Sequence, residues 1–285
     1  MSARRIETIP ELRLAVAEAR PLGPIGLVPT MGALHAGHAE LIRRASQECG
    51  FVVASIFVNP TQFDRTEDFQ RYPRTLAADL EFCAAHGAAV VFAPDAAEMY
   101  PGPPLTFVEA PTLAEKLCGE FRPGHFRGVA TVVAKLFNIV QPDRAYFGEK
   151  DAQQLAIIRQ MTADLDFPIV IVPIPTVREP DGLAMSSRNR LLSPAERRIA
   201  PALYQALLAA RSRVAAGATS AAEVREAALA ALAPHKAVRV EYLEIVDPAL
   251  MRPVERIAAP VLAAAAVWLG AVRLIDNVFC EPPRH

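Results

Sequence analysis

Hydrophobic residues in the first 175 positions fall into short runs that alternate with longer stretches of helical spacing. The run at 51–58 is typical of a strand buried on both faces. Similar runs predict strands at 25–29, 89–93, 144–147 and 169–172, and helical spacing predicts helices at 37–49, 76–86, 129–140 and 151–164. Strands that alternate with helices in this way predict βαβ units and a parallel sheet.

The pattern changes after residue 173. Three prolines and an Asp-Gly turn lie within residues 173–182, which indicates a linker. Ser-x-x-Glu capping boxes at 193–196 and 220–223 predict two helix starts, and strand-like segments follow at 238–246, 261–269 and 271–279. We therefore predict an α/β domain with a parallel sheet at 1–176 and a smaller α+β domain at 177–285.

Length and charge narrow the function classes. At roughly 150 residues per domain, 285 residues give about two domains. Lys plus Arg number 30 and Asp plus Glu 31, so the formal net charge is −1, which argues against nucleic acid or an anionic membrane as the main partner. Six residues are His and only four are Lys, so the positions of these residue types carry information.

Cysteine spacing and hydropathy bear on the compartment. The cysteines at 49, 83, 118 and 280 form no Cys-x-x-Cys pair and have no His at metal-finger spacing, which predicts buried thiols in a reducing environment. The basic residues near the N-terminus precede no apolar core, and the uncharged run at 257–272 is shorter than the ~20 residues of a spanning helix. We expect a soluble, cytoplasmic protein with no membrane partner.

The segment Pro29-Thr-Met-Gly-Ala-Leu-His-Ala-Gly-His38 joins the first predicted strand to the first predicted helix. A helix N-terminus presents unpaired N–H groups and a positive dipole end, which favour phosphate, and imidazoles there can donate further hydrogen bonds. Gly32 and Gly37 allow close backbone approach. We predict that His35 and His38 contact phosphate. Two surface histidines in a turn, or a metal site with a third ligand, are the alternatives.

The segment Gly148-Glu-Lys-Asp-Ala-Gln-Gln154 also lies between a predicted strand and helix. Such a loop lies at the carboxyl edge of a parallel sheet, where ligands bind. Lys150 can serve as a point charge for phosphate, Asp151 can accept from a ribose hydroxyl, and Gln154 would face the pocket. A solvated Glu-Lys-Asp helix start is the alternative.

Weaker signals lie in four other segments. The hydroxyls and guanidinium of Ala184-Met-Ser-Ser-Arg-Asn189 fit a phosphate clamp, although Ser-Ser-Arg occurs in many ordinary loops. Gln62 follows a buried strand and could orient a small polar acid. Asp79 could hold Mg²⁺ through water or be a surface helix residue. His125, in a Gly- and Pro-containing loop, either lines the site or packs.

These segments, in this order, resemble the pantothenate synthetase (pantoate–β-alanine ligase) family. The resemblance runs from about residue 25 to 190 through the motifs PTMGALHAGH at 29–38, VNPTQF at 58–63, RYPR at 71–74, RPGHF at 122–126, FGEKDAQQ at 147–154 and MSSRN at 185–189. Nucleotidyltransferases and class I aminoacyl-tRNA synthetases share only the His-x-Gly-His pair. The last third is similar mainly through Val240-Glu-Tyr-Leu-Glu244 and the closing strands.

The resemblance implies a two-step reaction. ATP and (R)-pantoate would form pantoyl adenylate and pyrophosphate, and the amine of β-alanine would then attack the acyl carbonyl to give pantothenate and AMP. It also implies Mg²⁺, a homodimer, a Rossmann-like domain at 1–176 that binds ATP and pantoate, and closure of the smaller C-terminal domain over the site as a lid. Residues 173–190 would then be a hinge.

The resemblance also implies residue roles. His38, His35, Lys150 and Arg188 would be catalytic, with His38 the better candidate for proton donation. The ATP site would comprise Met31, Gly32, His35, His38, Gly148, Lys150, Asp151, Val177, Met185, Ser186, Ser187 and Arg188. Gln62, Gln154, Met31 and Asn59 would bind pantoate or β-alanine. For the Mg²⁺ that the resemblance implies, Asp79 is the candidate ligand from the residue analysis above.

Adenylation needs positioning and cations more than a protein nucleophile, which agrees with these residue types. Two other function classes stay open at this point. A nucleotidyltransferase that acts on a phosphorylated acceptor would release a nucleotide-diphospho product instead of AMP. A non-catalytic nucleotide-binding module would bind ATP without releasing pyrophosphate.

Overall fold

A computed structural model describes residues 3–64 and 66–283. Contacts between backbone positions divide the chain into two units. The first unit comprises residues up to 110, 122–149 and 157–175, and the second comprises 111–121, 150–156 and residues from 176 onward. The units thus differ from the continuous ranges 1–176 and 177–285, because two short earlier segments group with the later part of the chain.

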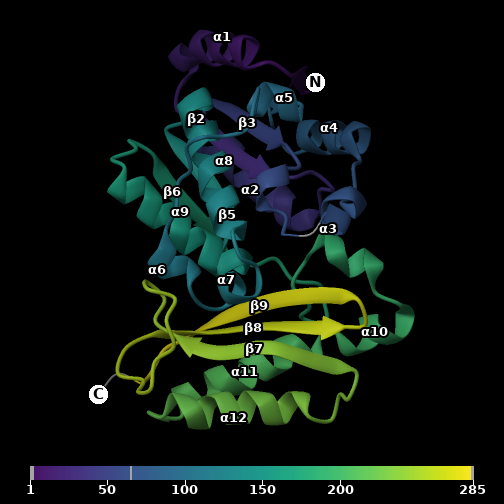
Figure 1. Cartoon of the computed structure of the whole chain (residues 1–285), viewed down its shortest axis with the longest axis vertical. Helices are drawn as coiled ribbons and strands as arrows, with labels where there is room; N and C mark the ends of the chain where they lie inside the picture. The colour runs from purple at the N-terminus through teal and green to yellow at the C-terminus, as the bar shows by residue number, and fades with distance from the viewer. Residues whose placement is uncertain (1–2, 65, 284–285) are drawn as a thin grey trace. The chain divides into compact units, whose positions relative to one another are not determined.

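A six-stranded parallel sheet forms the centre of the first unit (Figure 1), as the alternation of strands and helices predicts. Its strand order is β1-β4-β3-β2-β5-β6. The strands are β1 (Arg4–Ile6), β2 (Ile25–Thr30), β3 (Phe51–Ile56), β4 (Val90–Phe92), β5 (Arg144–Gly148) and β6 (Val170–Ile174). The predicted strands lie within two residues of these bounds, and only β1 has no predicted counterpart.

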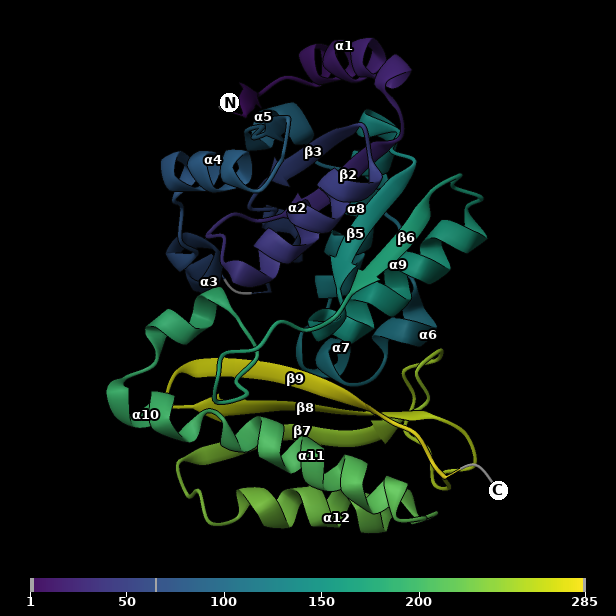
Figure 2. The same ribbon diagram turned by 180° about the vertical axis from the view of Figure 1, so that it is seen from behind.

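Helices cover both faces of this sheet. Helices α2 (Ala36–Glu48) and α4 (Leu76–Ala85) bury Leu41, Ile42 and Cys83 against strand residues such as Val28. Helices α1 (Ile9–Ala19) and α8 (His125–Val140) pack beside each other. Figure 1 draws α8 in front of the sheet and Figure 2 draws α2 there, so these two helices lie on opposite faces.

The second unit contains an antiparallel sheet in the order β7-β8-β9. Its strands are β7 (Val238–Val246), β8 (Val261–Leu269) and β9 (Val272–Cys280). Helices α11 (Ala202–Ala215) and α12 (Ala221–Leu232) bury Leu207 and Val224 against the sheet, in a core that continues through Ala263 and Ala265. The predicted α+β class is therefore confirmed.

The prediction of two helices within residues 177–285 is wrong, since the described residues of that range include a third, α10 (Pro194–Ile199), which precedes α11. The chain turns at Ala200 and Pro201, because proline has no N–H to continue the first helix. The capping box of Ser193 and Glu196 is complete. At the start of α12, Ser220 accepts from the N–H of Glu223.

Several short elements complete the described residues. The short helices are α3 (Thr66–Arg71), α5 (Ala96–Met99), α6 (Pro111–Ala114) and α7 (Cys118–Phe121), and α9 (Ala152–Asp164) contributes to both units. Single 3-10 turns lie at Arg20–Leu22, Pro60–Gln62, Glu149–Asp151 and Ser187–Leu191. No helix within the described ranges is long and apolar enough to cross a membrane. The four cysteines are free thiols.

Candidate active site

The predicted phosphate loop lies where the strand order reverses direction. Strand β2 connects to β3 on one side of the sheet, while its other neighbour, β5, connects to β6. In open parallel sheets, the crevice at such a switch point is the usual ligand site. Met31 and Gly32 follow β2, and Gly148 ends β5. The topology therefore brings these three predicted ATP contacts to one region of the carboxyl edge.

His35 and His38 cap the helix that they begin. His35 is the N-cap of α2, and its Nδ1 accepts from the N–H of Gly37 at 3.2 Å. His38, at position N3, accepts from the N–H of His35 through its own Nδ1 at 3.3 Å. This arrangement is a capping box with imidazoles in place of the usual hydroxyl and carboxylate. Two backbone donors that we expected to face phosphate are thus used within the loop.

The caps fix the hydrogen-bonding character of both rings. A neutral imidazole whose Nδ1 accepts a hydrogen bond carries its proton on Nε2. The ring centroids of His35 and His38 lie 4.1 Å apart, so the two imidazoles lie side by side at the start of α2. Two neighbouring imidazoles at a helix N-terminus can contact one anion, and the role that the motif predicts for this pair stays a prediction.

Asp79 holds the loop in front of these histidines. Its carboxylate accepts from the N–H groups of Ala33 at 3.0 Å and Leu34 at 2.9 Å, and from the hydroxyl of Thr75 at 3.0 Å. Gly32 and Ala33 have φ angles of +83° and +51°, a left-handed conformation that costs energy for alanine. The buried carboxylate stabilises this strained turn by satisfying its backbone donors.

The hypothesis that Asp79 binds Mg²⁺ is not supported by this environment. The residue is only 3% exposed, and each carboxylate oxygen already accepts a backbone N–H. Among the described residues, no group of three His, Cys, Asp or Glu side chains could hold a metal ion. The described part of the chain therefore offers no protein cage for a metal.

Asn59 and Gln62 form one network of side-chain amides. The Nδ2 of Asn59 donates to Oε1 of Gln62 at 3.1 Å and to the carbonyl of Gly128 at 3.1 Å. Its Oδ1 accepts from the hydroxyl of Tyr100 at 3.0 Å. Gln62 in turn lies against Met31, with its Nε2 3.0 Å from Sδ. The structure thus joins three predicted pantoate contacts, Met31, Asn59 and Gln62, and sets the orientation of the Gln62 amide.

His125 supports the same segment. Its Nδ1 lies 2.7 Å from the carbonyl oxygen of Gln62, at the start of α8. A Cβ atom at Gly128, one turn later, would lie 2.3 Å from the carbonyl oxygen of Thr61, so only glycine permits this approach. Sequence reasoning missed Gly128, although a glycine inside a helical pattern signals such close contact.

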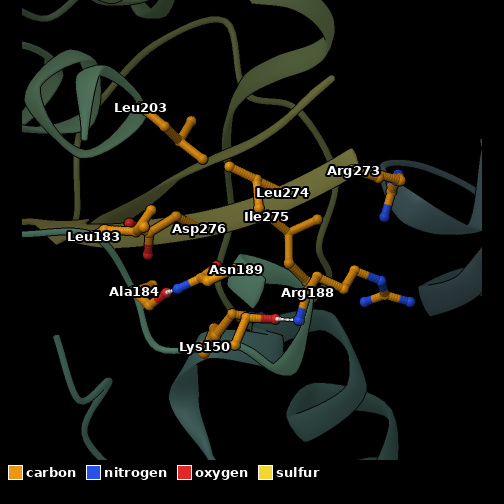
Figure 3. Close-up of a pocket in the computed structure, with 11 residues that line it drawn as sticks. Lys150, Leu183, Ala184, Arg188, Asn189, Leu203, Arg273, Leu274, Ile275 and Asp276 are labelled. Atoms are coloured by element: carbon orange, nitrogen blue, oxygen red, sulfur yellow. Dashed lines mark hydrogen bonds between the residues drawn. The ribbon is translucent and has the colours of Figure 1, made fainter. Parts of the chain in front are cut away.

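A pocket in the second unit is lined by three positively charged side chains, Lys150, Arg188 and Arg273 (Figure 3). Lys150, Ser186, Arg188 and Asn189 line it, together with β9 residues Arg273 to Asp276. Lys150 Nζ is 4.0 Å from the carboxylate of Asp151. Lys150 and Arg188 come from segments almost forty residues apart, and the fold brings them to one pocket.

The segment before Arg188 is held by local bonds. Met185 donates its N–H to the carbonyl of Val177 at 2.9 Å, which closes a loop. Ser186 accepts from the N–H of Arg188 at 3.3 Å and caps the turn that contains Ser187. Asn189 donates to the carbonyl of Ala184 at 3.1 Å. The loop therefore presents the Arg188 guanidinium, which is exposed, from a defined backbone.

Two adjacent glutamines on α9 have different environments. Gln153 is buried, donates to the carbonyls of Leu113 and Lys116 at 2.8 and 2.7 Å, and accepts from the N–H of Cys118 at 3.0 Å. Gln154 is half-buried on the next helix position. Gln153 therefore ties segment 111–121 to the rest of the second unit, and the predicted contact of Gln154 with a ligand stays a prediction.

Comparison with known proteins agrees with these features. A family model described as pantoate-beta-alanine ligase matches residues 4–279. The pantothenate synthetase of Moorella thermoacetica is 54% identical over 277 residues, which is 97% of this chain and 98% of that protein. The pantothenate synthetase of Acidobacterium capsulatum is 53% identical over 287 residues and 96% of each chain.

Solved structures agree as well. The crystal structure of pantothenate synthetase from Thermus thermophilus matches with a TM-score of 0.91 and 48% identity, over 96% of this chain and 98% of that one. Pantoate-beta-alanine ligase from Francisella tularensis, complexed with beta-gamma ATP and beta-alanine, matches with a TM-score of 0.80 and 33% identity over 97% of each chain. With a family match over nearly its whole length and relatives above 50% identity, the chain belongs to the pantoate–β-alanine ligase family.

Proposed function

We propose that this chain is an enzyme that condenses (R)-pantoate with β-alanine at the expense of ATP and releases pantothenate, AMP and pyrophosphate. A pantoate carboxylate oxygen attacks the α-phosphorus of ATP, pyrophosphate leaves, and the amine of β-alanine then displaces AMP from the acyl carbonyl. The family membership supports the overall reaction. The neighbouring imidazoles of His35 and His38, each of which accepts a backbone N–H through Nδ1 at the start of α2, are the observation that supports the first step.

In this proposal, His35 and His38 donate to ATP phosphate oxygens as negative charge grows on them. Lys150 and Arg188 supply positive charge toward the leaving pyrophosphate. These groups act by position and charge, so no protein nucleophile is needed. Asp151 accepts from the ribose, and Val177 and Met185 contact the nucleotide. Met31, Gly32, Gly148, Ser186 and Ser187 complete the contacts.

The pantoate site in this proposal consists of Gln62 and Gln154, with Met31 beside Gln62. Asn59 acts through Gln62, because its own amide is committed to hydrogen bonds within the fold. Holding the pantoate carboxylate near the α-phosphorus converts a bimolecular encounter into a step within one complex. The bound carboxyl group then stays in place for attack by β-alanine.

We place Mg²⁺ with the substrate. A nucleotide triphosphate binds Mg²⁺ through its phosphates, and the ion keeps several waters. The occupied carboxylate of Asp79 fits this assignment, as does the finding that no three His, Cys, Asp or Glu side chains in the described ranges could hold a metal ion. Because these residues form no protein cage, we derive no step through a protein-held metal. A homodimer and a cytoplasmic location remain predictions, and light scattering would test the first against the 30.8 kDa chain mass.

Pantoate-dependent exchange of labelled pyrophosphate into ATP tests the proposal. We expect exchange that requires pantoate, and AMP release once β-alanine is added. Replacing Lys150 or His38 with Ala should each reduce exchange by about 10²–10³-fold, the usual cost of losing one such group. Near-normal exchange in both variants would contradict their roles. A stable nucleotide-diphospho product would indicate a nucleotidyltransferase, and ATP binding without pyrophosphate release a binding module.

A further inference from the structure

Two consecutive residues of β9, Asp276 and Asn277, each bond to a different segment of the predicted ATP site. Both are largely buried, with exposed fractions of 3% and 8%. In Figure 3 the strand that carries Asp276 passes beside Lys150, Ala184 and Asn189. None of the family motifs quoted above includes these two residues.

Asp276 holds the loop that leads to Arg188. Its carboxylate accepts from Nη1 and Nη2 of Arg178 at 2.6 and 3.0 Å, in a bidentate pair. The Arg178 guanidinium also donates to the carbonyl of Gly182 at 3.1 Å and lies 3.6 Å from the ring centre of Tyr204. Since Arg178 pairs with Ala184 across the loop, Asp276 fixes both arms of the loop.

Asn277 holds the other segment. Its Nδ2 donates to the main-chain carbonyl of Lys150 at 2.9 Å, and its N–H donates to the carboxylate of Asp276 at 2.8 Å. The bond fixes the backbone from which the Lys150 side chain extends. The Lys150 side chain has four rotatable bonds, so a fixed starting point limits where its ammonium can go.

We propose that Asp276 and Asn277 are positioning residues that set the distance between Lys150 and Arg188 for one triphosphate. This inference rests on the proposed function, in which both cations meet the leaving pyrophosphate. Misplacement of a charged group by about 1 Å can cost on the order of 100-fold in rate. One strand that bonds to both segments removes their independent movement and so preorganises the pair.

The test compares Asn277→Ala with Arg225→Ala. Arg225 donates to the carbonyl of Leu243 at 2.7 Å in the same unit, so its loss also removes one side-chain-to-backbone bond, but it touches neither segment. We expect Asn277→Ala to weaken ATP binding by about tenfold, the effect of one lost hydrogen bond, and to leave the KM for β-alanine unchanged. Arg225→Ala should change only the melting temperature.

A double-mutant cycle then separates positioning from general stability. ATP affinity is measured by calorimetry for the wild type, Asn277→Ala, Lys150→Ala and the double variant. If Asn277 acts through Lys150, its replacement costs nothing further once Lys150 is Ala. Unchanged ATP affinity in Asn277→Ala, or fully additive losses in the cycle, would overturn the proposal.

Because the cycle measures ATP binding and not turnover, it tests the positioning role of Asn277 separately from the proposed reaction. If the wild type shows no pantoate-dependent exchange, the proposed function fails, while the cycle still reports on ATP binding. Asp276→Asn leaves the buried Arg178 guanidinium without its carboxylate partner, and this loss can unfold the protein. The paired change of Asp276→Asn with Arg178→Met removes that charge, and we expect it to fold and to weaken ATP binding in the same way.

Discussion

Asp79 accepts the backbone N–H of Leu34 at 2.9 Å, across 45 positions of the sequence. We expect Asp79→Asn to lower stability by about 1–3 kcal/mol, because the amide nitrogen would face a buried N–H that needs an acceptor. Pantoate-dependent exchange should fall with the loss of loop order, while the Mg²⁺ concentration for half-maximal rate stays the same. Glu81→Gln, an exposed change on the same helix, is the control. A large shift in the Mg²⁺ requirement would instead identify Asp79 as a metal ligand.

The imidazole capping box allows the two roles of His38 to be separated. Gln at position N3 can still accept from the N–H of His35, as in an ordinary capping box, but it lacks the ring donor. We expect His38→Gln and His38→Ala to lose exchange by a similar factor, about 10²–10³. Only His38→Ala should also lose about 0.5–2 kcal/mol of stability in urea unfolding. Full activity in the Gln variant would remove the imidazole from the mechanism.

Replacing Gln153 with Ala should change stability, whereas replacing Gln154 with Ala should change the KM for pantoate. Gln153→Ala removes three buried hydrogen bonds and should destabilise the protein by about 2–4 kcal/mol, with the KM for pantoate unchanged. Gln154→Ala should raise the KM for pantoate and leave the melting temperature near that of the wild type. Thermal melts and initial rates on both variants test this pair, and a normal pantoate KM in Gln154→Ala would exclude it from the site.

Buried thiols predict a loss of stability at alkaline pH. Burial raises the pKa of Cys83 from 9.0 to about 12 and that of Cys280 to about 11. Above about pH 9 the unfolded chain releases these protons while the native chain keeps them, so stability falls as the pH rises toward the native pKa values. Urea unfolding between pH 8 and about pH 11 should show a shallower decline when both cysteines are Ala. If the free energy of unfolding declines with pH equally steeply in the wild type and the variant, the two thiols are not the cause of the alkaline loss of stability.

The linker prediction can be tested with trypsin. Arg188 and Arg190 are exposed within the 173–190 segment, which we expect to act as a hinge. ATP plus pantoate should slow cleavage after both residues, because Arg188 would contact phosphate. Cleavage after Lys236, an exposed turn residue outside this segment, should not change. If the cleavage rates after Arg188 and Arg190 do not change, the closure hypothesis loses its support.

Local patterns predicted the parallel sheet and the position of His35 and His38, because both depend on residues that are neighbours in sequence. The pattern of α1 was also present, since Leu12, Ala15, Val16 and Ala19 are spaced as one helix face with Pro10 at its start, but it was not predicted. Helix α8 begins four residues before the predicted range 129–140, because the left-handed Gly124 is its N-cap and the glycine- and proline-containing pattern before residue 129 is typical of a loop.

Other features could not be predicted, because they depend on contacts between a side chain and a distant backbone. Any carboxylate could accept from Ala33 and Leu34, so nothing near Asp79 marks it as their partner. In the same way, the bond from Gln153 to Leu113 leaves no sequence signature, and the interleaved units follow from such bonds. The hydrogen bonds that the Asn59 amide makes with Gly128 and Tyr100 are also contacts with distant residues, so the sequence does not reveal them.

The bond from Asn277 to Lys150 spans 127 positions, so it can form only after the ribosome has made nearly the whole chain. A nascent chain that has reached residue 200 already contains the His-x-Gly-His pair, Lys150 and the Arg188 loop, yet it lacks the strand that holds the last two in place. ATP binding should therefore arise late in translation. Chains made from messenger RNA truncated before the codon for Asn277 should carry every family motif quoted above but bind the nucleotide poorly.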